Sequence, residues 1–430
     1  MLKKSPTAIT IERDDLNRAL IDLSYVVEPR TTLPILECVK IEPDAGGIRI
    51  TGCDLSDFLS IVVPGEMTGP AICVDHKSLK RQISGFRGPM TMQADGVDAI
   101  TGTNAGVRFK LAARDPVDFP KPDASVNKVA LATNFDDCET FGWALERCTP
   151  AISTEETRYY LNGISMGFER RNAAEIFRCV ATDGHKLVRC WLPEAHSLKG
   201  ASTADAGAAS PKKPRKKKAA TGTAVATIAW TMHGIVPRKA CRALLRLLQR
   251  TEGRIDIKAH STDNAPWFTF QAGNWTLVSR TIDGTFPDYN RVIPQASDVK
   301  TTVTLPLDEL QMVLAGLNGI ARPGNAVPIL VEVGAKDVTL TARSFVREEE
   351  TTNKQGITSK KPIYEEATAM VDATIAGPKV KIALSRTYLL DLIDGADETV
   401  TLHIVDPASP CFIGDADEPD LTQVVMPMRW

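Results

Sequence analysis

The sequence lacks the long apolar runs and cysteine pairs that mark membrane and disulfide-rich proteins. No run approaches the roughly 18 apolar residues that cross a bilayer, and the basic N-terminal stretch is not followed by the apolar segment of a signal peptide. The nine cysteines form no CxxC pair and have no histidine at ligand spacing. We therefore expect a cytoplasmic protein with reduced, mostly buried cysteines and with no metal or other cofactor.

An excess of charge of one sign is also missing. The 51 lysines and arginines nearly balance the 53 aspartates and glutamates, which gives a formal net charge of −2. A protein that coats nucleic acid by bulk attraction needs a strongly basic surface, so this class is excluded. A protein that holds DNA topologically, with only a locally basic face, remains possible on this composition.

Complete catalytic motifs are absent as well. The chain has no nucleophile elbow, no HExxH and no glycine-rich phosphate loop that ends in Lys-Ser or Lys-Thr. The segment TDGHK at 182–186 could supply Asp183 and His185 as the acid–base pair of a hydrolase. An Asp-Gly-His sequence is more often a turn, so the hydrolase is a remote alternative to a protein without catalytic activity.

Length and internal repetition indicate three similar domains. A chain of 430 residues is too long for one ordinary core, since domains of roughly 100–200 residues are usual. TTLPIL at 31–36 recurs as NAVPIL at 325–330, each time after a predicted helix and before strands. RYYLNGISMGF at 158–168 fits the same frame as a middle copy, and DFPK at 118–121 is echoed by TFPDYN at 285–290. We predict domains at 1–127, 128–296 and 297–430.

Apolar spacing predicts two amphipathic helices in each copy, with alternating strands between them. Asp75 is placed to cap one of these helices, and Pro237 stands where the first turn of another is expected. The predicted helices cover 14–27, 75–85, 134–149, 237–250, 306–321 and 385–394. Two helices and two sets of strands in each copy define an α+β domain whose helices lie on one face of an antiparallel sheet.

Two stretches interrupt the repeat and are interpreted as insertions. Residues about 197–226 are rich in Ala, Gly, Ser, Thr and Lys and cannot bury enough apolar surface to order themselves. Their basic cluster PKKPRKKK at 211–218 is either an auxiliary nucleic-acid contact or a solubilising linker. Residues 346–366 are expected to form a charged hairpin or loop.

The predicted helix at 237–250 carries the sharpest electrostatic signal. Arg238, Arg242, Arg246 and Arg250 recur every four residues, opposite an apolar stripe of Cys241, Leu244, Leu245 and Leu248. No acidic residue stands at the matching i+4 positions, so DNA phosphates are the natural partner.

The predicted helix at 75–85 repeats this basic face with Lys77, Lys80 and Arg81. A solvated face is the bland alternative for any single helix. Recurrence at equivalent places in two copies favours DNA, although the third copy offers little beyond Arg386.

The C-terminal QVVMPMRW supplies adaptable apolar surface of the kind found in peptide grooves, or else an ordinary final strand. Five motifs, in this order along the chain, now resemble one family: the bacterial DNA polymerase III beta subunit, or sliding clamp. They are RTTLPIL (30–36), EETRYYLNG (155–163), VATDGHKL (180–187), TIDGTFPDYNRVIP (281–294) and VVMPMR (424–429).

The resemblance implies a head-to-tail homodimer that closes into a six-domain ring around duplex DNA, with helices lining the hole and sheets outside. Such a clamp makes a replicative polymerase processive. Polymerase, clamp-loader and repair proteins would dock short peptides between the second and third domains. An accessory or decoy clamp, which binds partners without supporting main replication, is the alternative within the family, because the insertion at 197–226 is atypical.

The family motifs also assign residues. The implied peptide groove consists of Leu161, Thr182, Gly184, His185, Leu187, Pro287, Arg291, Val292, Val424, Met426, Pro427, Met428 and Arg429. Arg30 matches a position that approaches DNA, and Phe109 and Ile320 fall where the ring interface is expected. Trp430 replaces a smaller aliphatic end and could reshape the groove, and Lys186 replaces the commoner arginine.

Overall fold

One order of elements occurs three times along the chain. The computed structural model describes residues 6–28, 30–94, 96–123, 129–171, 174–193, 196–198, 233–260, 266–320, 327–352, 358–396, 398–414 and 420–430. In these residues each unit consists of one strand, a helix, five strands, a second helix and three further strands. The expected threefold α+β repeat is therefore confirmed.

The elements of the three units are as follows. The first unit contains β1 (Thr7–Glu12), α1 (Arg13–Leu23), β2 (Cys38–Asp44), β3 (Gly47–Cys53), β4 (Asp57–Val63), β5 (Gly65–Thr68), β6 (Ile72–Asp75), α2 (His76–Ile83), β7 (Pro89–Ala94), β8 (Ala99–Asn104) and β9 (Val107–Arg114). The second contains β10 (Val129–Phe135), α3 (Cys138–Cys148), β11 (Gly163–Arg171), β12 (Ala174–Thr182), β13 (Lys186–Leu192), β14 (His196–Leu198), β15 (Gly234–Pro237), α4 (Arg238–Leu248), β16 (Ile255–His260), β17 (Trp267–Ala272) and β18 (Trp275–Arg280). The third contains β19 (Thr301–Pro306), α5 (Leu307–Gly316), β20 (Pro328–Val333), β21 (Asp337–Thr352), β22 (Thr358–Asp372), β23 (Thr374–Ala376), β24 (Lys381–Ser385), α6 (Arg386–Ile393), β25 (Thr399–Ile404), β26 (Cys411–Gly414) and β27 (Leu421–Val425).

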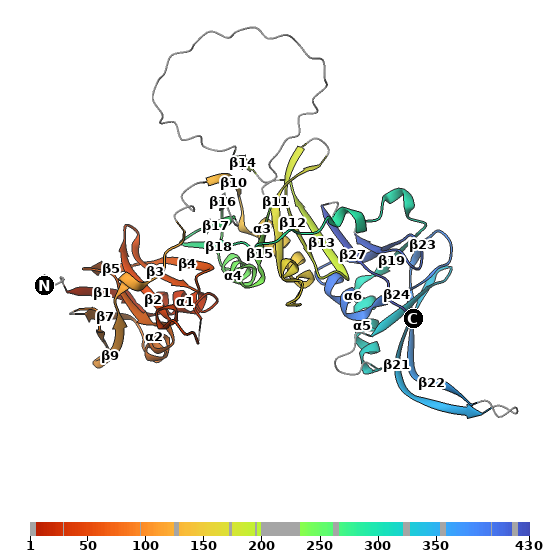
Figure 1. Ribbon diagram of the computed structural model, residues 1–430, viewed down its shortest axis with the longest axis horizontal. Helices are drawn as coiled ribbons and strands as arrows, with labels where there is room; N and C mark the ends of the chain where they lie inside the picture. Colours follow the sequence, from red (N-terminus) through yellow and green to blue (C-terminus); the bar gives the residue numbers. More distant parts are fainter. Residues whose placement is uncertain are drawn as a thin grey trace, which may run out of the picture.

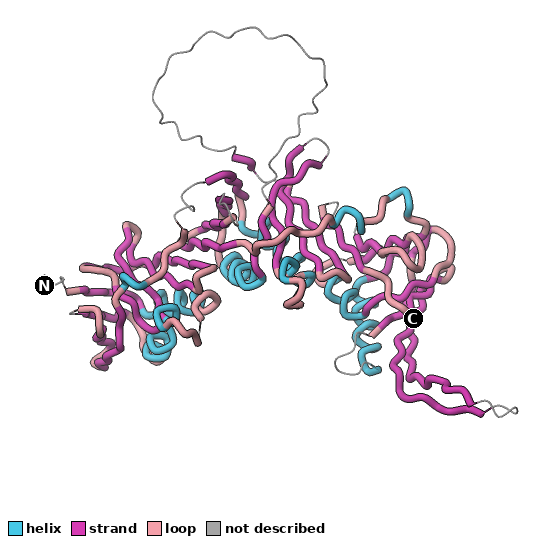
Figure 2. Tube along the Cα trace, in the orientation of Figure 1, coloured by secondary structure: helices cyan, strands magenta, loops and turns pink. Residues whose placement is uncertain are grey.

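The units lie in a row, with the α-helices gathered on one side and strands on the other (Figures 1 and 2). The apolar faces of the helices pack on the sheets: Leu16, Leu20 and Leu23 of α1 are fully buried. Burying one such side chain stabilises the fold by roughly 1.5–3 kcal/mol. All nine cysteines are buried and free of disulfides, as expected.

Capping side chains set where several helices begin. Asp75 accepts a hydrogen bond from the Ser78 N–H, as predicted for the cap of α2. Asp137 accepts from the Thr140 N–H, so α3 begins at Cys138, and Asn134 and Phe135 of the predicted helix belong to β10.

Three details of the predicted helices are wrong. Pro237 has extended backbone and precedes α4 as its N-cap, because its preceding residues pair as strand β15. Leu245 is only half-buried, and Leu247 takes a buried place instead. The helix expected over 306–321 ends at Gly316 and continues as a 3-10 turn, η8 (Leu317–Ile320).

Strands join the units into continuous sheets. The last strand of the second unit, β18, pairs with β4 of the first, from Trp275 opposite Ile61 to Ser279 opposite Asp57. The last strand of the third unit, β27, pairs in the same way with β13 of the second. The predicted boundary between residues 127 and 128 falls outside the described residues, and the limits of the three domains stay a prediction.

The seam between the first two units contains a buried carboxyl group. Asp57 is 2% exposed and its Oδ1 has no hydrogen-bond partner among the described residues. Burial raises its pKa to about 6, although a hydrogen bond from Ser279 acts in the opposite direction. The seam therefore holds an aspartate that is partly protonated near neutral pH.

The third hairpin is much longer than its two counterparts. β21 and β22 pair from Asp337 opposite Asp372 to Thr352 opposite Thr358, with a bulge between Phe345 and Arg347. The hairpin projects from the end of the row in Figure 1. A charged hairpin over 346–366 is thus confirmed for its described residues, whereas most of the other insertion, including 211–218, lies outside them.

Candidate peptide groove and basic helix face

A tight turn between β12 and β13 forms one wall of the candidate groove. Gly184 has a φ of +90°, which favours glycine, and a Cβ there would lie 2.6 Å from Nη1 of Arg158. The Asp183 carboxylate accepts hydrogen bonds from the N–H groups of His185 (2.8 Å) and Lys186 (2.9 Å). Asp183 thus holds the turn through these two backbone hydrogen bonds.

The groove is a hollow of about 270 Å3 between the second and third units. Four separate segments contribute to it: the 3-10 turn η5 (Tyr159–Leu161), the β12–β13 turn, the linker that contains η6 (Tyr289–Val292), and the end of β27. It is lined by Arg158, Tyr160, Leu161, Thr182, Gly184, His185, Lys186, Leu187, Pro287, Asp288, Tyr289, Val292, Val424 and Met426.

Nine of the thirteen residues assigned to the groove from the family motifs line this hollow. They are Leu161, Thr182, Gly184, His185, Leu187, Pro287, Val292, Val424 and Met426. Arg291, Pro427, Met428 and Arg429 are not among its lining residues. Arg291 is exposed and pairs with Asp288, and the Met428 N–H donates to the Ala383 carbonyl oxygen, which carries the tail away along β24.

The terminal tryptophan does not line the groove either. The Arg343 guanidinium lies 4.1 Å from the centre of the Trp430 ring and 4.7 Å from that of Tyr364. Such cation–π contacts stabilise by roughly 0.5–1 kcal/mol at exposed sites. The indole is therefore held on β21, at the base of the long hairpin.

Lys186 and His185 tie the groove to the third unit. The Lys186 ammonium group is 5% exposed, pairs with Asp391 and lies 4.9 Å from the centre of the Tyr388 ring. The His185 ring stacks on the same tyrosine at 5.9 Å. Lys186, Tyr289, Arg158, Tyr160 and Asp288 are groove residues that the sequence assignment omitted, although all five stand in or beside the motifs that it used.

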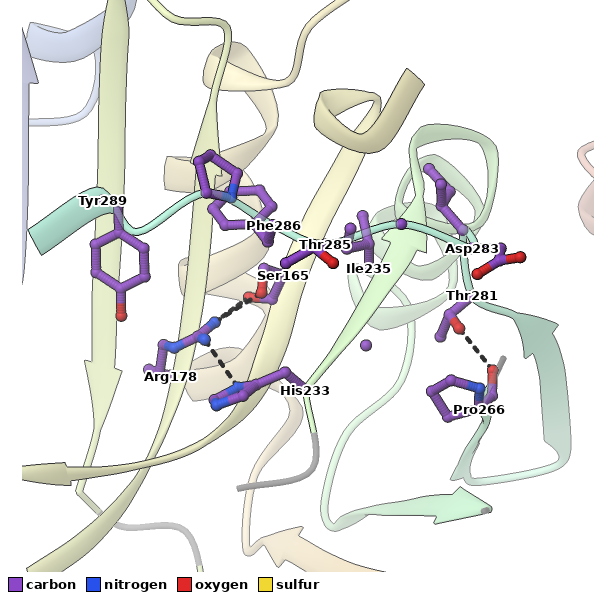
Figure 3. Close-up of a pocket in the computed structure, with 14 residues that line it drawn as sticks. Ser165, Arg178, His233, Ile235, Pro266, Thr281, Asp283, Thr285, Phe286 and Tyr289 are labelled. Carbon is purple, nitrogen blue, oxygen red and sulfur yellow. Dashed lines mark hydrogen bonds between the residues drawn. The ribbon is translucent and has the colours of Figure 1, made fainter. Parts of the chain in front are cut away.

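A buried ion network contacts the linker that contains η6. Arg178, 4% exposed, donates to Glu169, to the carbonyl and hydroxyl oxygens of Ser165, and to Nδ1 of His233. Figure 3 shows this arginine among the residues that line a second hollow, of about 320 Å3. Tyr289 lines both hollows.

The network also fixes protonation states. The Tyr289 hydroxyl donates to Glu169, and burial raises the pKa of this tyrosine. Burial also raises the pKa of Glu169, but the tyrosine hydrogen bond and the Arg178 charge outweigh it and leave the pKa lowered. The carboxylate stays charged and holds Tyr289 as a rigid wall of the groove.

The four arginines of α4 do not share one environment. Arg242 and Arg250 are exposed, and Arg250 reaches Asp22 of α1 at 3.2 Å. Arg238 and Arg246 are half-buried, and their Nε atoms have no hydrogen-bond partner among the described residues. Burial, with the like charge of Arg242, lowers the pKa of Arg238.

A polar hollow of about 580 Å3 opens beside the start of α4. Its walls come from the end of α1, from residues 153 and 154, and from the first turns of α4. It is lined by Ser24, Tyr25, Ser153, Thr154, Asn162, Arg238, Lys239 and Arg242. Hydroxyl groups beside unpaired guanidinium nitrogens suit a phosphate group.

The other predicted cationic residues lie on the first unit. Lys77 and Arg81 of α2 are exposed and Lys80 is half-buried, on the same helical side of the row as α4. Arg30 is exposed in the segment after α1.

The two residues expected at a ring interface lie at opposite ends of the row. Phe109 on β9 is buried in the first unit against Phe86, at 5.7 Å. Ile320 ends η8 beside the β21–β22 hairpin of the third unit.

The described residues contain neither a cluster of metal-binding side chains nor a helix that could span a membrane. No group of three or more histidine, cysteine, aspartate or glutamate side chains that could hold a metal ion was found in this part of the chain. In the same residues no helix is long and apolar enough to cross a membrane.

Comparisons with known proteins match the whole chain. The family profile described as "DNA polymerase III beta subunit, C-terminal domain" matches residues 346–429. The "Beta sliding clamp" of Caulobacter vibrioides is 28% identical over 98% of this chain and 99% of its own length. That of Escherichia coli K12 is 27% identical over 98% of this chain and 99% of its own length.

Solved structures give the same result. The Caulobacter crescentus beta sliding clamp is 25% identical and superimposes with a TM-score of 0.79 over 99% of this chain and all of that one. The DNA polymerase III subunit beta sliding clamp of Bartonella birtlesii, solved with griselimycin bound, is 22% identical with a TM-score of 0.79 over the same shares.

The fold is thus that of a three-unit DNA clamp, with a groove between its second and third units. Over its whole length the chain is similar to the bacterial beta sliding clamps, the DNA polymerase III beta subunits.

Proposed function

We propose that two copies of this chain form a closed ring that encircles duplex DNA and tethers a replicative DNA polymerase to it. The observation that carries this proposal is the repeated junction. The last strand of a unit pairs with the fourth strand of the preceding unit at both internal junctions. By the same rule, β9 is a last strand that has no preceding unit in the chain to pair with, and β22 is a fourth strand that has no following unit.

Both unused strands have free edges. β22 ends its four-stranded sheet, so its outer edge has no neighbour among the described residues. β9 pairs with β6 only at Ala113 and Arg114, which leaves the described edge from Val107 to Ala112 open. Because β9 and β22 lie at opposite ends of the row, pairing β22 with β9 of a second copy is head-to-tail, and two copies close it into a ring.

The register at the ring junction follows from the repeat. Strands β6, β15 and β24 end at the helix caps Asp75, Pro237 and Ser385. From each cap, the paired residues can be followed across the sheet, strand by strand, to the fourth strand of the unit. This places Phe58, Leu187 and Glu366 at equivalent positions. Phe58 faces Val278 and Leu187 faces Val424 across the internal junctions.

The equivalent of Val278 on β9 is Lys110, which follows the buried Phe109 as Val278 follows the buried Leu277. We therefore place Glu366 of one copy opposite Lys110 of the other. Where the internal junctions have apolar pairs, the ring junction would have an ion pair. Such a pair is weakened by salt, which suits a junction that must open to admit DNA.

DNA would pass along the helical side of the row. Phosphate contacts come from Arg238, Arg242, Arg246 and Arg250 of α4, from Lys77, Lys80 and Arg81 of α2, and from Arg30. These residues contact the backbone without reading base sequence, and the near-zero net charge leaves retention to the topology of the ring. A nucleoid-associated cytoplasmic protein is consistent with this role.

Polymerase, clamp-loader and repair proteins would dock short peptides in the groove. Leu161, Leu187, Val292, Val424 and Met426 offer apolar walls for leucine and aromatic side chains, which are the usual anchors in such hollows. Arg158 and Asp288 add polar groups to its lining.

The test is retention of the clamp on circular DNA. After loading by a clamp loader onto a nicked circle, we expect the protein to elute with the circle at a salt concentration that strips ordinary basic proteins. Cutting the circle with a restriction enzyme should release it. Equal retention on circular and linear DNA would contradict topological tethering.

A further inference from the structure

The first junction, between the first and second units, has a turn built like that of the groove. Cys53 faces Phe58 across the β3–β4 turn. Thr182 faces Leu187 in the same way across the β12–β13 turn of the groove. The Asp54 carboxylate accepts hydrogen bonds from the N–H groups of the second and third residues after it, at 2.9 and 2.7 Å, as the aspartate of the groove turn does. The first junction therefore contains the frame of a second groove.

The apolar walls of the groove also have counterparts at the first junction. Leu36 takes the place of Leu161, since each is buried two residues before the second strand of its unit. Val278 of β18 takes the place of Val424 of β27, because the first faces Phe58 and the second faces the counterpart of Phe58 in the groove. Three walls of the groove thus recur at the first junction.

Aromatic side chains fill this second frame. Trp267 of β17 is 7% exposed, and its ring centre lies 6.2 Å from that of Phe58. The tryptophan shares a buried cluster with Leu36, Cys38, Cys53, Phe58, Cys73 and Phe119. A phenylalanine therefore stands where the groove has the smaller Leu187, and an indole packs against it. Side chains of this size bury more apolar surface than any others, so the first junction is a packed contact.

The groove has no indole at the matching place. Trp267 faces Arg280, which lies two residues after the wall residue of β18. Its counterpart two residues after the wall residue of β27 is Met426, which lines the groove. Continuing the β26–β27 ladder by one residue brings Pro410 opposite Met426. A proline thus stands where the first junction has a tryptophan, and the hollow beside Met426 stays open.

The first junction also lacks the guanidinium group that lines the groove. Leu33 stands in place of Arg158, since each lies five residues before the second strand of its unit. Leu55 takes the place of Gly184 and has the same left-handed backbone, with a φ of +78°. In the groove a Cβ at Gly184 would lie 2.6 Å from the arginine. The two turns therefore share a backbone and differ in the side chains that a peptide would meet.

We propose that Trp267 and Phe58 determine where partner peptides dock. At the first junction they occupy the space that the apolar anchors of a peptide take at the second. This inference rests on the proposed groove. It means that one repeated frame serves as a filled contact in one place and as an open site in the other. Each chain then binds one peptide, and a ring of two chains binds two.

The first experiment opens the first junction. Phe58→Leu together with Trp267→Ala gives this junction the smaller side chains of the groove. Isothermal titration with a peptide that has leucine and phenylalanine anchors should give one site in the original chain and two in the variant. The new site should be about tenfold weaker, because Leu33 supplies no charge.

Each result of this titration separates the inference from the groove on which it rests. One site in the variant would overturn the filled frame, and so would two sites in the original chain. An original chain that binds no peptide would instead contradict the proposed groove.

A second aromatic residue controls for a general loosening of the fold. Phe141 of α3 is fully buried and stacks on Phe270 at 5.9 Å. Phe141→Ala should lower the melting temperature, because it leaves a cavity in the core, yet it should keep one peptide per chain. A second peptide site in this variant would assign the effect to loosening and overturn the inference.

Indole tests the filled space even in a variant that is too unstable for titration. An apolar cavity left by truncation binds a small aromatic molecule, and binding to the folded state raises its stability. Millimolar indole should therefore raise the melting temperature of Trp267→Ala and leave that of the original chain unchanged. An equal effect on both proteins, or none on either, would show that Trp267 does not occupy a defined space.

Photo-cross-linking shows where the second peptide lies. A peptide with a benzophenone side chain in place of phenylalanine should label residues 158–161, 182–187 or 424–426 of the original chain. In the double variant it should also label residues 33–36, 53–58 or 278–280. Labelling of the second set in the original chain would overturn the inference, as would its absence from the variant.

Discussion

At the scale of single residues, the seam aspartate gives the protein a defined pH response. The pKa of Asp57 is raised by burial to about 6 in the folded chain, above its ordinary value near 3.8. Between these values the folded state binds more protons than the unfolded state, so the free energy of unfolding falls as pH rises. Stability from this group is thus greatest in mild acid and is lost as pH rises through 6.

Asp57→Asn should remove this response. The amide cannot ionise, so we expect the free energy of unfolding at pH 7.5 to increase by roughly 1–3 kcal/mol relative to the original chain. The difference should be much smaller near pH 4, where the carboxyl is neutral in the folded state and only about half ionised in the unfolded state. Urea unfolding of both proteins at the two pH values measures it; an equal difference at both would exclude ionisation as the cause.

The α4 arginines allow a second prediction at this scale. Arg238→Gln with Arg242→Gln should weaken binding to duplex DNA and reduce the slope of log K against log salt concentration by about 1–2, one unit for each lost phosphate contact. Arg254→Gln is the control, because Arg254 pairs with Asp256 at 2.6 Å. Fluorescence anisotropy over a salt series measures both slopes. An unchanged slope would place α4 away from DNA.

At the scale of elements, much of the fold could be predicted from sequence. The helices follow from apolar spacing and from caps such as Asp75, because both signals are local. The helix expected over 14–27 ends at Leu23, and the helix expected over 134–149 begins only at Cys138, where Asp137 caps it. Pairing of β4 with β18 and of β13 with β27 has no local signal, since it joins residues more than 200 positions apart.

The candidate groove could be predicted only in part, because some of its contacts also join residues far apart in the sequence. His185, Leu187 and Val292 stand inside conspicuous motifs. Lys186 stands there too, but its partner Asp391 lies on a helix of another unit and could not be inferred from spacing. The last residues of the tail were assigned to the groove by motif, while the chain leaves it after Met426 to pair with β24.

The groove itself can be tested by shortening its walls. Met426→Ala or Val292→Ala should weaken binding of a peptide with leucine and phenylalanine anchors about tenfold, because each truncation removes apolar contact at a buried anchor. Met312→Ala, exposed on α5, is the control. Fluorescence polarisation with a labelled peptide gives the affinities. Equal affinities for the original chain and the three variants would contradict peptide binding in this groove.

The ring junction can be tested by exchanging charges between β9 and β22. Lys110→Glu should place two carboxylates opposite each other and weaken the dimer about tenfold or more. Adding Glu366→Lys reverses the pair and should restore dimerisation. Sedimentation equilibrium at low and high salt measures both. If the double variant is as weak as Lys110→Glu alone, the register is wrong.

At the scale of the whole molecule, three similar units are joined by one kind of junction. The junction repeats twice within the chain and leaves complementary free strands at its two ends, so the same contact can continue into a second copy. In the proposed ring, gathering the helices on one side would place α4 and α2, which carry these basic residues, toward the enclosed space. Ring closure and DNA binding therefore depend on the same arrangement of units.

The shape of the particle in solution tests this account most directly. Class averages from electron microscopy of the purified chain should show a closed ring of two copies, with six units and a central hole wide enough for a double helix. Single three-unit particles, or a solid dimer with α4 facing bulk water, would contradict it.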